Sequence, residues 1–339
     1  MKEDRSLQVP QVVIVSPALA DANNGNWQTA RRWQQFLSLP TRIIKQWPDE
    51  LADRDRVMLA LHARRSSPSI DNWRDAHRVR GLAVILTGTD LYRDIESDAS
   101  AQRSLRLADA LVVLQECGPL AVPAAFRGKT RVIFQSTRRR KTVVKGVRRL
   151  RALMVGHLRA EKDPEVLFAA ARLLAERDDI RIDHVGHALD QLLGEAAMAT
   201  MAVSASYRWL GGLVHAATRR RIQRADLLIH ASRMEGGAHV VMEAVCSGTP
   251  VIASAIDGNI GMLGGDYAGY FGCGDATGLA ALLLQCRASQ GQSDGLLARL
   301  AAQCQQRAAL FAPAAERAAV RQLVAELLAD PITDPTAAA

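Results

Sequence analysis

The stretch that decides the fold is residues 225–254, ADLLIHASRMEGGAHVVMEAVCSGTPVIAS in one-letter code. An apolar, strand-like run (225–232) leads into a glycine-containing loop, a short helical segment and a second strand-like run (248–254). This order is typical of one βαβ unit, with its loop at the carboxyl end of the first strand. Open α/β sheets bind ligands in crevices outside these strand ends. The stretch therefore predicts a parallel α/β sheet that carries a ligand site.

Two glutamates in this stretch lie eight residues apart. Glu235 falls in the loop and Glu243 on the first turns of the helix, so we expect both to face the crevice. Two such carboxylates accept hydrogen bonds from a ligand rich in hydroxyl groups, such as a sugar or a ribose. Gly236 and Gly237 precede the helix N-terminus, whose N–H groups favour a phosphate. A sugar nucleotide presents all of these groups together, so the pattern predicts one as ligand.

Composition bounds the class of protein. The chain has 339 residues, 48% of them hydrophobic, and is long enough for two globular domains. No apolar run approaches the roughly 20 residues of a membrane span, and no apolar stretch follows the first charged residues, so we expect neither integral membrane association nor a secretion signal. The five cysteines are dispersed without a CxxC spacing, which is typical of reduced thiols. These features predict a cytoplasmic protein.

The net charge of +8 points to an anionic ligand. Only 4% of the residues are aromatic and none interleave with the basic runs, which argues against stacking on single-stranded nucleic acid. We interpret the basic run at 219–221 as a solvated helix face. For the run at 138–141, a solvated segment and a ligand-facing one both stay open. The charge therefore favours a small anion over a nucleic acid.

Short strand-like runs recur through both halves of the chain, separated by helical or polar segments. They lie at 11–16, 57–61, 82–86, 110–114 and 131–135, and then at 151–156, 181–185, 207–211, 225–232 and 248–254. This alternation is typical of parallel sheets with helical crossovers. We predict an N-terminal Rossmann-like domain at 1–147 and a C-terminal one at 148–312, facing each other across a cleft. Residues 313–339 are expected to form a helix that packs on the N-terminal domain, with a flexible tail.

The loop after the first strand of the second half carries Lys162, just before a helix that opens with Asp163-Pro164. We expect Asp163 to cap this helix and Pro164 to occupy its first position. A lysine at a strand end points into the crevice and places a point charge on a diphosphate. The alternative is a surface lysine paired with Glu161 or Asp163. Its position opposite the glutamate pair favours the diphosphate role.

The loop after the first strand of the first half contains Asn24, Gly25 and Asn26. These residue types tolerate turn conformations. Successive N–H groups exposed before a helix nest an anion. The alternative is a plain surface turn, but the position at a strand end favours binding.

Two further strand ends of the first half carry polar side chains. His62 and Arg64 follow one strand, and the histidine is open to a structural or a catalytic role. Asp90 and Arg93 follow the next. Asp90 either binds a hydroxyl group or caps the following helix. With the arginines, these loops predict a basic site for a small anion.

No cluster of His, Cys, Asp or Glu has the spacing of a metal site, and neither GxSxG nor GxxxxGK[ST] occurs. We therefore expect no metal and no bound cofactor. A sugar nucleotide would enter this protein as a substrate.

The second half resembles family 4 of the retaining glycosyltransferases, which have the GT-B fold. The resemblance rests on Glu235 and Glu243 with the strand Gly-Thr-Pro-Val-Ile-Ala-Ser at 248–254. It implies that Glu243 binds the ribose of the nucleotide and that Glu235 contacts the transferred sugar in catalysis. It also implies that backbone groups contact the sugar and the distal phosphate, at Gly236, Gly237, Ala238 and His239.

The family's Gly-Arg-Leu-x3-Lys loop is present as Gly156-His157-Leu158 and Lys162. His157 replaces the family's arginine. The resemblance therefore implies that Lys162, helped by His157 or Arg159, holds the diphosphate. Thr87-Gly-Thr-Asp90 stands where the family has a histidine motif.

The first half is similar to a narrower group, the selenosugar synthases of selenoneine biosynthesis. The similar stretches are 16–33, SPALADANNGNWQTARRW, and 86–94, LTGTDLYRD. The resemblance implies transfer of glucose or N-acetylglucosamine from a UDP-sugar to selenophosphate, which forms a carbon–selenium bond. The basic, anion-nesting loops of this half are compatible with such an acceptor.

Two alternatives stay open. The first is a family 4 transferase that acts on a hydroxyl acceptor, for which we would expect an apolar or extended acceptor groove. The second is a non-catalytic nucleotide-sugar sensor or a nucleic-acid binder. The intact Glu235 and Glu243 argue against a sensor, and the scarcity of aromatic residues argues against nucleic acid.

Overall fold

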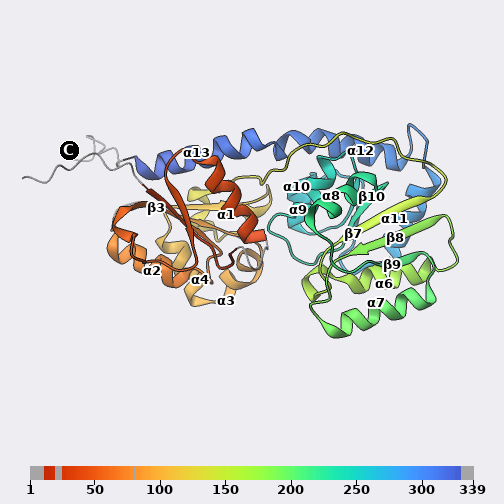
Figure 1. Cartoon of the computed structure of the whole chain (residues 1–339), viewed down its shortest axis with the longest axis horizontal. Helices are drawn as coiled ribbons and strands as arrows, with labels where there is room; N and C mark the ends of the chain where they lie inside the picture. Colours follow the sequence, from red (N-terminus) through yellow and green to blue (C-terminus); the bar gives the residue numbers. More distant parts are fainter. Residues whose placement is uncertain (1–10, 20–24, 79–80, 330–339) are drawn as a thin grey trace, which may run out of the picture. The chain divides into compact units, whose positions relative to one another are not determined.

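The computed structural model describes residues 11–19, 25–78 and 81–329, and the chain divides into two compact units (Figure 1). The first unit contains residues 1–114, 119–133 and 314–339, and the second contains residues 115–118 and 134–313. Residues 134–147, which the sequence pattern places in the N-terminal domain, thus lie with the second unit. Residues 330–339, the end of the range in which a tail is expected, lie outside the described residues.

The first unit holds a six-stranded parallel sheet in the order β2-β1-β3-β4-β5-β6. Its strands are β1 (Gln11–Val15), β2 (Thr41–Ile44), β3 (Asp55–Leu61), β4 (Leu82–Ile85), β5 (Ala110–Val113) and β6 (Thr130–Val132). Helices in and beside this unit are α1 (Gly25–Phe36), α2 (Ser67–Ala76), α3 (Ile95–Ser97), α4 (Ala99–Leu107), α5 (Gly118–Ala121) and α13 (Pro313–Leu328). A π-helical turn, η2 (Asp90–Asp94), follows β4.

Alternate residues of each strand supply the two faces of this sheet. Val12 and Ile14 of β1 enter a core shared with side chains of α1 and α13. Val13 and Val15 enter a second core shared with α2 and α4. Because both faces are covered by helices, the strands are apolar without alternation, as parallel sheets require.

Helix α13 is tied to α1 by a buried carboxylate. Glu316 is 1% exposed and accepts hydrogen bonds from Arg32 Nε at 2.7 Å and Arg32 Nη2 at 3.0 Å. The indole Nε1 of Trp33 donates to the same residue at 2.7 Å. These bonds, together with the apolar face of α13, attach the last described helix to the first unit.

The second unit holds another six-stranded parallel sheet, in the order β12-β11-β10-β7-β8-β9. Its strands are β7 (Leu150–Val155), β8 (Ile180–Val185), β9 (Tyr207–Trp209), β10 (Leu227–His230), β11 (Val251–Ser254) and β12 (Tyr270–Phe271). Its helices are α6 (Pro164–Leu173), α7 (Gln191–Val203), α8 (His215–Arg224), α9 (His239–Val245), α10 (Asp257–Leu263), α11 (Ala276–Ala288) and α12 (Leu296–Arg307) (Figure 1). The strands β2 and β12 are absent from the sequence-based prediction, because β2 is only partly buried and opens with Thr41 and Arg42, and β12 has only two residues.

Residues 134–149 form an irregular segment that belongs to the second unit. The N–H of Arg140 donates to the carbonyl of Cys246 at 2.8 Å. Gly248 has φ +68°, and a Cβ there would lie 2.2 Å from Thr142 Oγ1. Only glycine allows this approach, so the segment is fixed against the end of α9.

Candidate functional site

Glu235 lies in the loop that joins β10 to α9, at the carboxyl edge of the second sheet. Gly258, in the first turn of α10, packs against the backbone of this loop. A Cβ on Gly258 would lie 2.1 Å from the carbonyl oxygen of Glu235. The absence of a side chain there lets α10 hold the loop in place.

Three donors surround one oxygen of the Glu235 carboxylate. Lys162 Nζ forms an ion pair with Oε1, Ser232 Oγ donates to it at 2.8 Å, and His230 Nε2 lies 3.4 Å away. Oε2 has no partner among the residues that the structure describes. Burial acts to raise the pKa of Glu235, but Lys162 and His230 outweigh it and hold the pKa well below its usual range. Glu235 is therefore ionised at neutral pH, with one oxygen available to a ligand.

Lys162 ends the 3₁₀ turn Ala160–Lys162 that follows β7. Its aliphatic stem lies over Gly156, where a Cβ would meet it at 3.5 Å. The side chain is 18% exposed, so the ammonium keeps access to solvent while it pairs with Glu235. The structure therefore brings together the two residues that the sequence pattern assigns to catalysis.

The cap expected from Asp163 is absent. Asp163 has φ +47° and makes no side-chain hydrogen bond to the helix that begins at Pro164. Its carboxylate pairs with Arg233, with Nε at 2.9 Å and Nη2 at 3.2 Å. The N–H of Arg233 also donates to the carbonyl of Glu161 at 3.0 Å. These contacts join the loop after β7 to the loop after β10, which places Lys162 beside Glu235.

Glu243 lies on α9 and its carboxylate meets side chains of α8. His215 Nε2 lies 2.7 Å and Arg219 Nη1 3.6 Å from Glu243 Oε1. The hydrogen bond to Glu243 raises the pKa of His215, although partial burial acts in the opposite direction. Glu243 thus presents a nearly buried carboxylate, with a side chain 8% exposed, to two basic side chains of α8.

The interpretation of residues 219–221 as a solvated helix face is wrong for Arg219. Its side chain is 4% exposed and its Nη2 donates to the carbonyl of Arg138 at 3.0 Å. A buried guanidinium needs such partners. His215 and Arg219 are four residues apart on α8 and so share one face, and this spacing is the signal that could have identified them.

The loops after β7 and β8 meet at two histidines. His157 Nδ1 accepts the backbone N–H of His187 at 3.1 Å, and the two rings stack with centroids 5.6 Å apart. Since Nδ1 accepts, the ring proton of His157 lies on Nε2, which makes it a neutral donor. Arg159 is exposed, and its Nε lies 3.9 Å from Glu161 Oε2. His157 therefore supplies a hydrogen bond, and not a fixed charge, where the resembled family has an arginine.

Backbone groups between Glu235 and α9 complete this edge. The N–H of Ala238 donates to Met262 Sδ at 3.1 Å, and helix α9 begins at the next residue, His239. The N–H groups of Gly236 and Gly237 donate to no acceptor within the described part of the chain. They therefore remain available for an anionic ligand.

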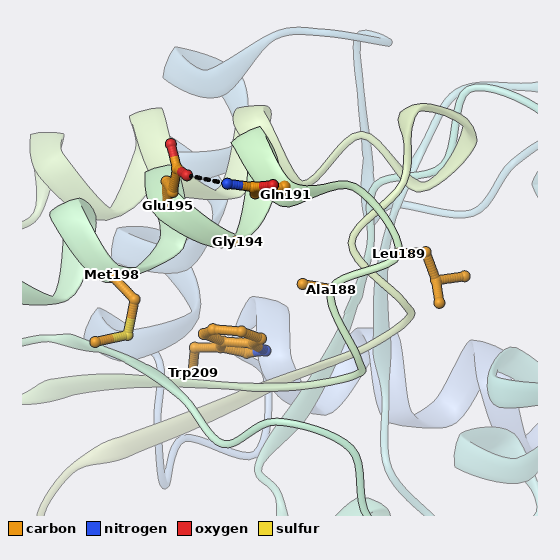
Figure 2. A pocket seen from close by; sticks show the side chains of 7 residues that line it. All are labelled: Ala188, Leu189, Gln191, Gly194, Glu195, Met198 and Trp209. Atoms are coloured by element: carbon orange, nitrogen blue, oxygen red, sulfur yellow. Dashed lines mark hydrogen bonds between the residues drawn. The ribbon is translucent and has the colours of Figure 1, made fainter.

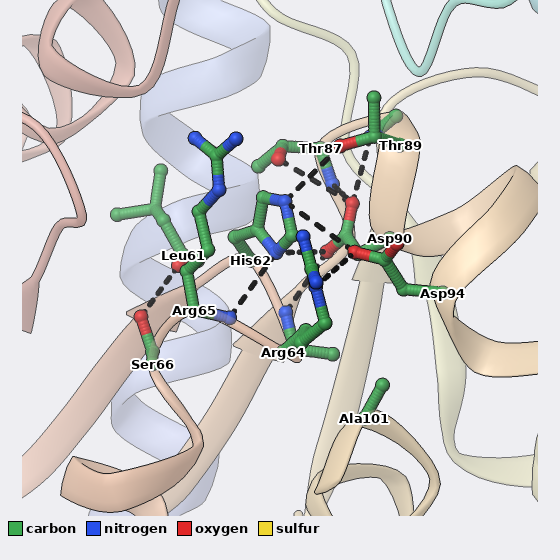
Figure 3. A network of polar contacts seen from close by, with 12 residues as sticks. Leu61, His62, Arg64, Arg65, Ser66, Thr87, Thr89, Asp90, Asp94 and Ala101 are labelled. Atoms are coloured by element: carbon green, nitrogen blue, oxygen red, sulfur yellow. Dashed lines mark hydrogen bonds and ion pairs between the residues drawn. The ribbon is translucent and has the colours of Figure 1, made fainter. Parts of the chain in front are cut away.

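In the first unit, His62 directly follows β3 and has φ +76°. A left-handed conformation is rare for a residue other than glycine and is often found at functional sites. Its Nδ1 accepts the N–H of Arg65 at 3.4 Å, and its Nε2 lies 3.1 Å from Thr89 Oγ1 (Figure 3). Burial lowers the pKa of His62 despite the nearby carboxylates of Asp90 and Asp94, so the ring is neutral at neutral pH.

Asp90 is completely buried, so a direct contact with a substrate hydroxyl is not available to it. Its Oδ1 accepts the N–H groups of Thr87 at 2.8 Å and Gly88 at 2.9 Å, and its Oδ2 accepts the N–H of Ala63 at 2.9 Å. These bonds connect the loops after β3 and β4 (Figure 3). The structure thus gives Asp90 a positioning role, closer to the capping alternative than to hydroxyl binding.

Arg64 and Arg93, predicted separately from two loops, meet at one carboxylate. Arg64 Nε donates to Asp94 Oδ2 at 2.9 Å and Arg93 Nε donates to Asp94 Oδ1 at 3.3 Å. Asp94 is absent from the sequence-based prediction. Its role depends on the π-helical turn η2, which the residue pattern does not reveal.

The predicted anion nest falls partly outside the structure. Asn24 lies outside the described residues. Gly25 and Asn26 are the first residues of α1. The carbonyl of Gly25 accepts Thr29 Oγ1 at 2.8 Å. This helix N-terminus follows the carboxyl end of β1, as the sequence pattern requires.

A hollow of about 710 Å³ lies beside α7 (Figure 2). It is lined by Ala188, Leu189, Gln191, Gly194, Glu195, Met198 and Trp209. The indole N–H of Trp209 donates to the carbonyl of Gly186 at 2.8 Å. The hollow contains none of the predicted site residues, and we assign it no substrate.

Among the described residues, no three His, Cys, Asp or Glu side chains gather in a way that would hold a metal ion. Within the same residues, no helix is long and apolar enough to cross a membrane.

Residues 135–290 match the family model "Glycosyl transferases group 1". No curated protein sequence matches the chain. Sucrose-phosphate synthase from Thermosynechococcus elongatus has a similar structure, with a TM-score of 0.72 and 16% identity over 94% of this chain and 99% of that one. HepE of Anabaena, solved with UDP, gives a TM-score of 0.65 and 17% identity over 94% of this chain and 99% of that one.

TarM of S. aureus, solved with fondaparinux, alpha-GlcNAc-glycerol and UDP, gives a TM-score of 0.63 and 12% identity over 81% of this chain. This chain spans 55% of the TarM chain. At such low identities these likenesses show the fold alone. The chain has the GT-B fold, with two α/β domains built on six-stranded parallel sheets, and residues 135–290, which lie in its second unit, are similar to the group 1 glycosyl transferases.

Proposed function

We propose that this protein transfers a sugar, glucose or N-acetylglucosamine, from a UDP-sugar to selenophosphate and forms a carbon–selenium bond. The observation that carries the donor half is the Glu235 carboxylate, which stays ionised and has Oε2 without a partner among the described residues. The selenium acceptor rests on the resemblance of residues 16–33 and 86–94 to selenosugar synthases.

In this proposal Glu243 accepts hydrogen bonds from the ribose hydroxyls, and Glu235 accepts them from the sugar. Gly236, Gly237 and His239 contribute backbone groups towards the sugar and the distal phosphate, whereas the N–H of Ala238, also predicted for this role, donates to Met262 Sδ. The family match and the UDP present in the TarM and HepE structures support UDP as the nucleotide.

Lys162 has two anionic partners in the proposed cycle. It pairs with Glu235 in the structure, and it would move towards the diphosphate when the UDP-sugar binds, with His157 Nε2 and Arg159 nearby. The bond from the anomeric carbon to the phosphate oxygen breaks, and its electron pair leaves with UDP. An ammonium and N–H groups placed where this charge develops lower the barrier.

The acceptor half uses residues of the first unit. A selenium lone pair of selenophosphate forms the new bond to carbon. Because this selenium is already anionic, it needs little help from a general base. Arg64 and Arg93 would attract the anion, with backbone groups at Asn24, Gly25 and Asn26 in support.

A hydroxyl acceptor is the second candidate, and the match of residues 135–290 to the group 1 glycosyl transferases is compatible with it. His62 is not suited to act as its general base, because its side chain is 3% exposed and its two ring nitrogens already contact the N–H of Arg65 and Thr89 Oγ1.

The test is acceptor-dependent release of UDP. The purified protein would be incubated with UDP-glucose or UDP-N-acetylglucosamine, alone and with selenophosphate, and UDP would be measured over time. We expect release only when selenophosphate is present. If neither donor releases UDP with any acceptor, although the protein is folded, the proposed function is wrong.

A further inference from the structure

Asp94 holds two arginines that come from different loops. Arg64 follows β3, and Arg93 belongs to η2 after β4. Each donates through Nε to a different oxygen of the same carboxylate, at 2.9 Å and 3.3 Å. The Nη groups of both arginines donate to no acceptor among the described residues. The structure thus presents two guanidinium groups with their terminal donors unused.

The carboxylate is buried and the cations are not. The Asp94 side chain is 5% exposed, whereas those of Arg64 and Arg93 are 41% and 51% exposed. The oxygens of the nearby Asp90 carboxylate accept three backbone N–H groups and bond to neither arginine. The Nη donors of Arg64 and Arg93 are therefore the accessible, unused polar groups of this cluster.

The two loops that carry Arg64 and Arg93 have uncommon backbone conformations. His62 has φ +76° and precedes Arg64 by two residues, and η2 is a π-helical turn. Both features are uncommon in ordinary surface loops and cluster at functional sites. The bonds from Asp90 to Ala63, Thr87 and Gly88 connect the two loops. Their combined effect is to bring Arg64 and Arg93 to one carboxylate.

We propose that Arg64 and Arg93, aligned by Asp94, form a binding site for the tetrahedral oxyanion of a phosphate-type group. The inference deepens, and for the identity of the natural ligand rests on, the proposed function. A guanidinium presents donors in a planar fork that matches phosphate oxygens. Two such forks side by side suit a group with three terminal oxygens. This chemistry is shared by free phosphate, thiophosphate, selenophosphate and phosphomonoesters.

The substitution Asp94→Asn separates two explanations. An effect of net charge and an effect of alignment would change the affinity for phosphate in opposite directions. If only net charge matters, Asp94→Asn removes a negative charge and tightens the binding of an anion. If Asp94 aligns the two arginines, the same substitution weakens binding. A surface pair of the same residue types, Arg103 with Asp71 at 2.6 Å, provides matched controls in Arg103→Gln and Asp71→Asn.

The experiment is calorimetric titration of the full chain, without a sugar nucleotide, with inorganic phosphate, thiophosphate and glycerol 3-phosphate. We expect Arg64→Gln and Arg93→Gln each to weaken phosphate binding by about tenfold, the size expected for loss of a charge-assisted hydrogen bond. Asp94→Asn should weaken it as well, and the Arg103 and Asp71 variants should bind as the parent does. Tighter binding of glycerol 3-phosphate than of phosphate would assign the site to a phosphomonoester, and the reverse to a free anion.

Two outcomes would overturn the inference. One is tighter phosphate binding by Asp94→Asn, and the other is loss of phosphate binding in Lys162→Gln but not in the Arg64 and Arg93 variants. If Asp94→Asn does not fold, Arg64→Lys and Arg93→Lys keep the charge but lose the fork, and undiminished binding by both would contradict the site. UDP titrated into the same samples separates the two proposals: UDP binding without phosphate binding rejects only this inference, and phosphate binding without UDP binding rejects only the proposed function.

Discussion

The ammonium of Lys162 forms an ion pair with Glu235 Oε1, the same oxygen that accepts a hydrogen bond from Ser232. Each of the two residues is thus the other's ionic partner in the structure. A diphosphate must compete with Glu235 for Lys162, while a sugar hydroxyl finds Oε2 available.

This competition predicts opposite effects of Glu235→Gln on binding and on turnover. The substitution removes the charge that holds Lys162, so UDP should bind equally well or more tightly. Turnover should fall by about ten- to a hundredfold, since a hydrogen bond to a charged group contributes roughly 1.5–3 kcal/mol. Calorimetry with UDP and initial rates would measure the two effects. Glu161→Gln, in the loop of Lys162, is the control; equal losses of affinity and turnover in Glu235→Gln would contradict these roles.

Glu243→Ala should weaken UDP binding by about ten- to a hundredfold, because the ribose hydroxyls lose a charged acceptor. The same substitution should lower the pKa of His215, since the hydrogen bond to Glu243 raises it. Calorimetry and an NMR titration of the imidazole would measure the two effects. Glu195→Ala, an exposed glutamate of α7, should change neither. An unchanged affinity for UDP in a folded Glu243→Ala protein would show that Glu243 does not bind the ribose.

His184 gives the second unit a pH-dependent stability. It is completely buried, donates from Nε2 to the carbonyl of Gly156 and accepts from Tyr207 at Nδ1. Burial lowers the pKa of His184 from 6.5 to about 4. Because the folded-state pKa is the lower one, the unfolded chain takes up the proton first as the pH falls. The stabilisation is complete above about 6.5 and is lost towards pH 4, by at most about 3 kcal/mol.

Hydrogen exchange of the β8 and β9 amides at several pH values would measure this loss. His184→Gln should flatten the pH dependence between about 6.5 and 4, whereas His187→Gln, at an exposed ring, should leave it as in the parent. An unchanged slope in His184→Gln would show that another group is responsible.

Local signals in the sequence predicted that Glu235 and Lys162 would meet at the carboxyl edge of the second sheet, and the structure places them in contact. Glu235, Gly236 and Gly237 lie between two apolar strands, and Lys162 lies between a strand and a proline-led helix. The partners of these residues were harder to find. His230 and Ser232 belong to the strand end itself and look like strand residues. Arg219 meets Glu243 only because α8 packs beside α9.

The polar cluster after β3 and β4 was less predictable for a related reason. Arg64 lies 30 residues before Asp94 in the chain, and their contact depends on parallel pairing of β3 with β4 and on the π-helical turn. Neither backbone feature has a clear residue signature. The strand β2 escaped prediction because it opens with Thr41 and Arg42 and is only partly buried, and β12 because it has two residues.

Activity should survive an excess of EDTA. The proposed neutralisation of the diphosphate uses Lys162 and backbone N–H groups, and the described residues contain no cluster suited to a divalent ion. Initial rates before and after chelation, with magnesium or manganese added back, would measure this. A loss of activity that either metal restores would show that the charge is neutralised differently.

The most direct test of the central claim is mass spectrometry of the product formed from a UDP-sugar and selenophosphate. The account predicts a sugar product with the isotope pattern of selenium, formed in step with UDP and lost in Glu235→Gln. If no UDP-sugar yields a selenium-containing product while a hydroxyl acceptor is glycosylated efficiently, the selenium acceptor is wrong and the protein glycosylates a hydroxyl group.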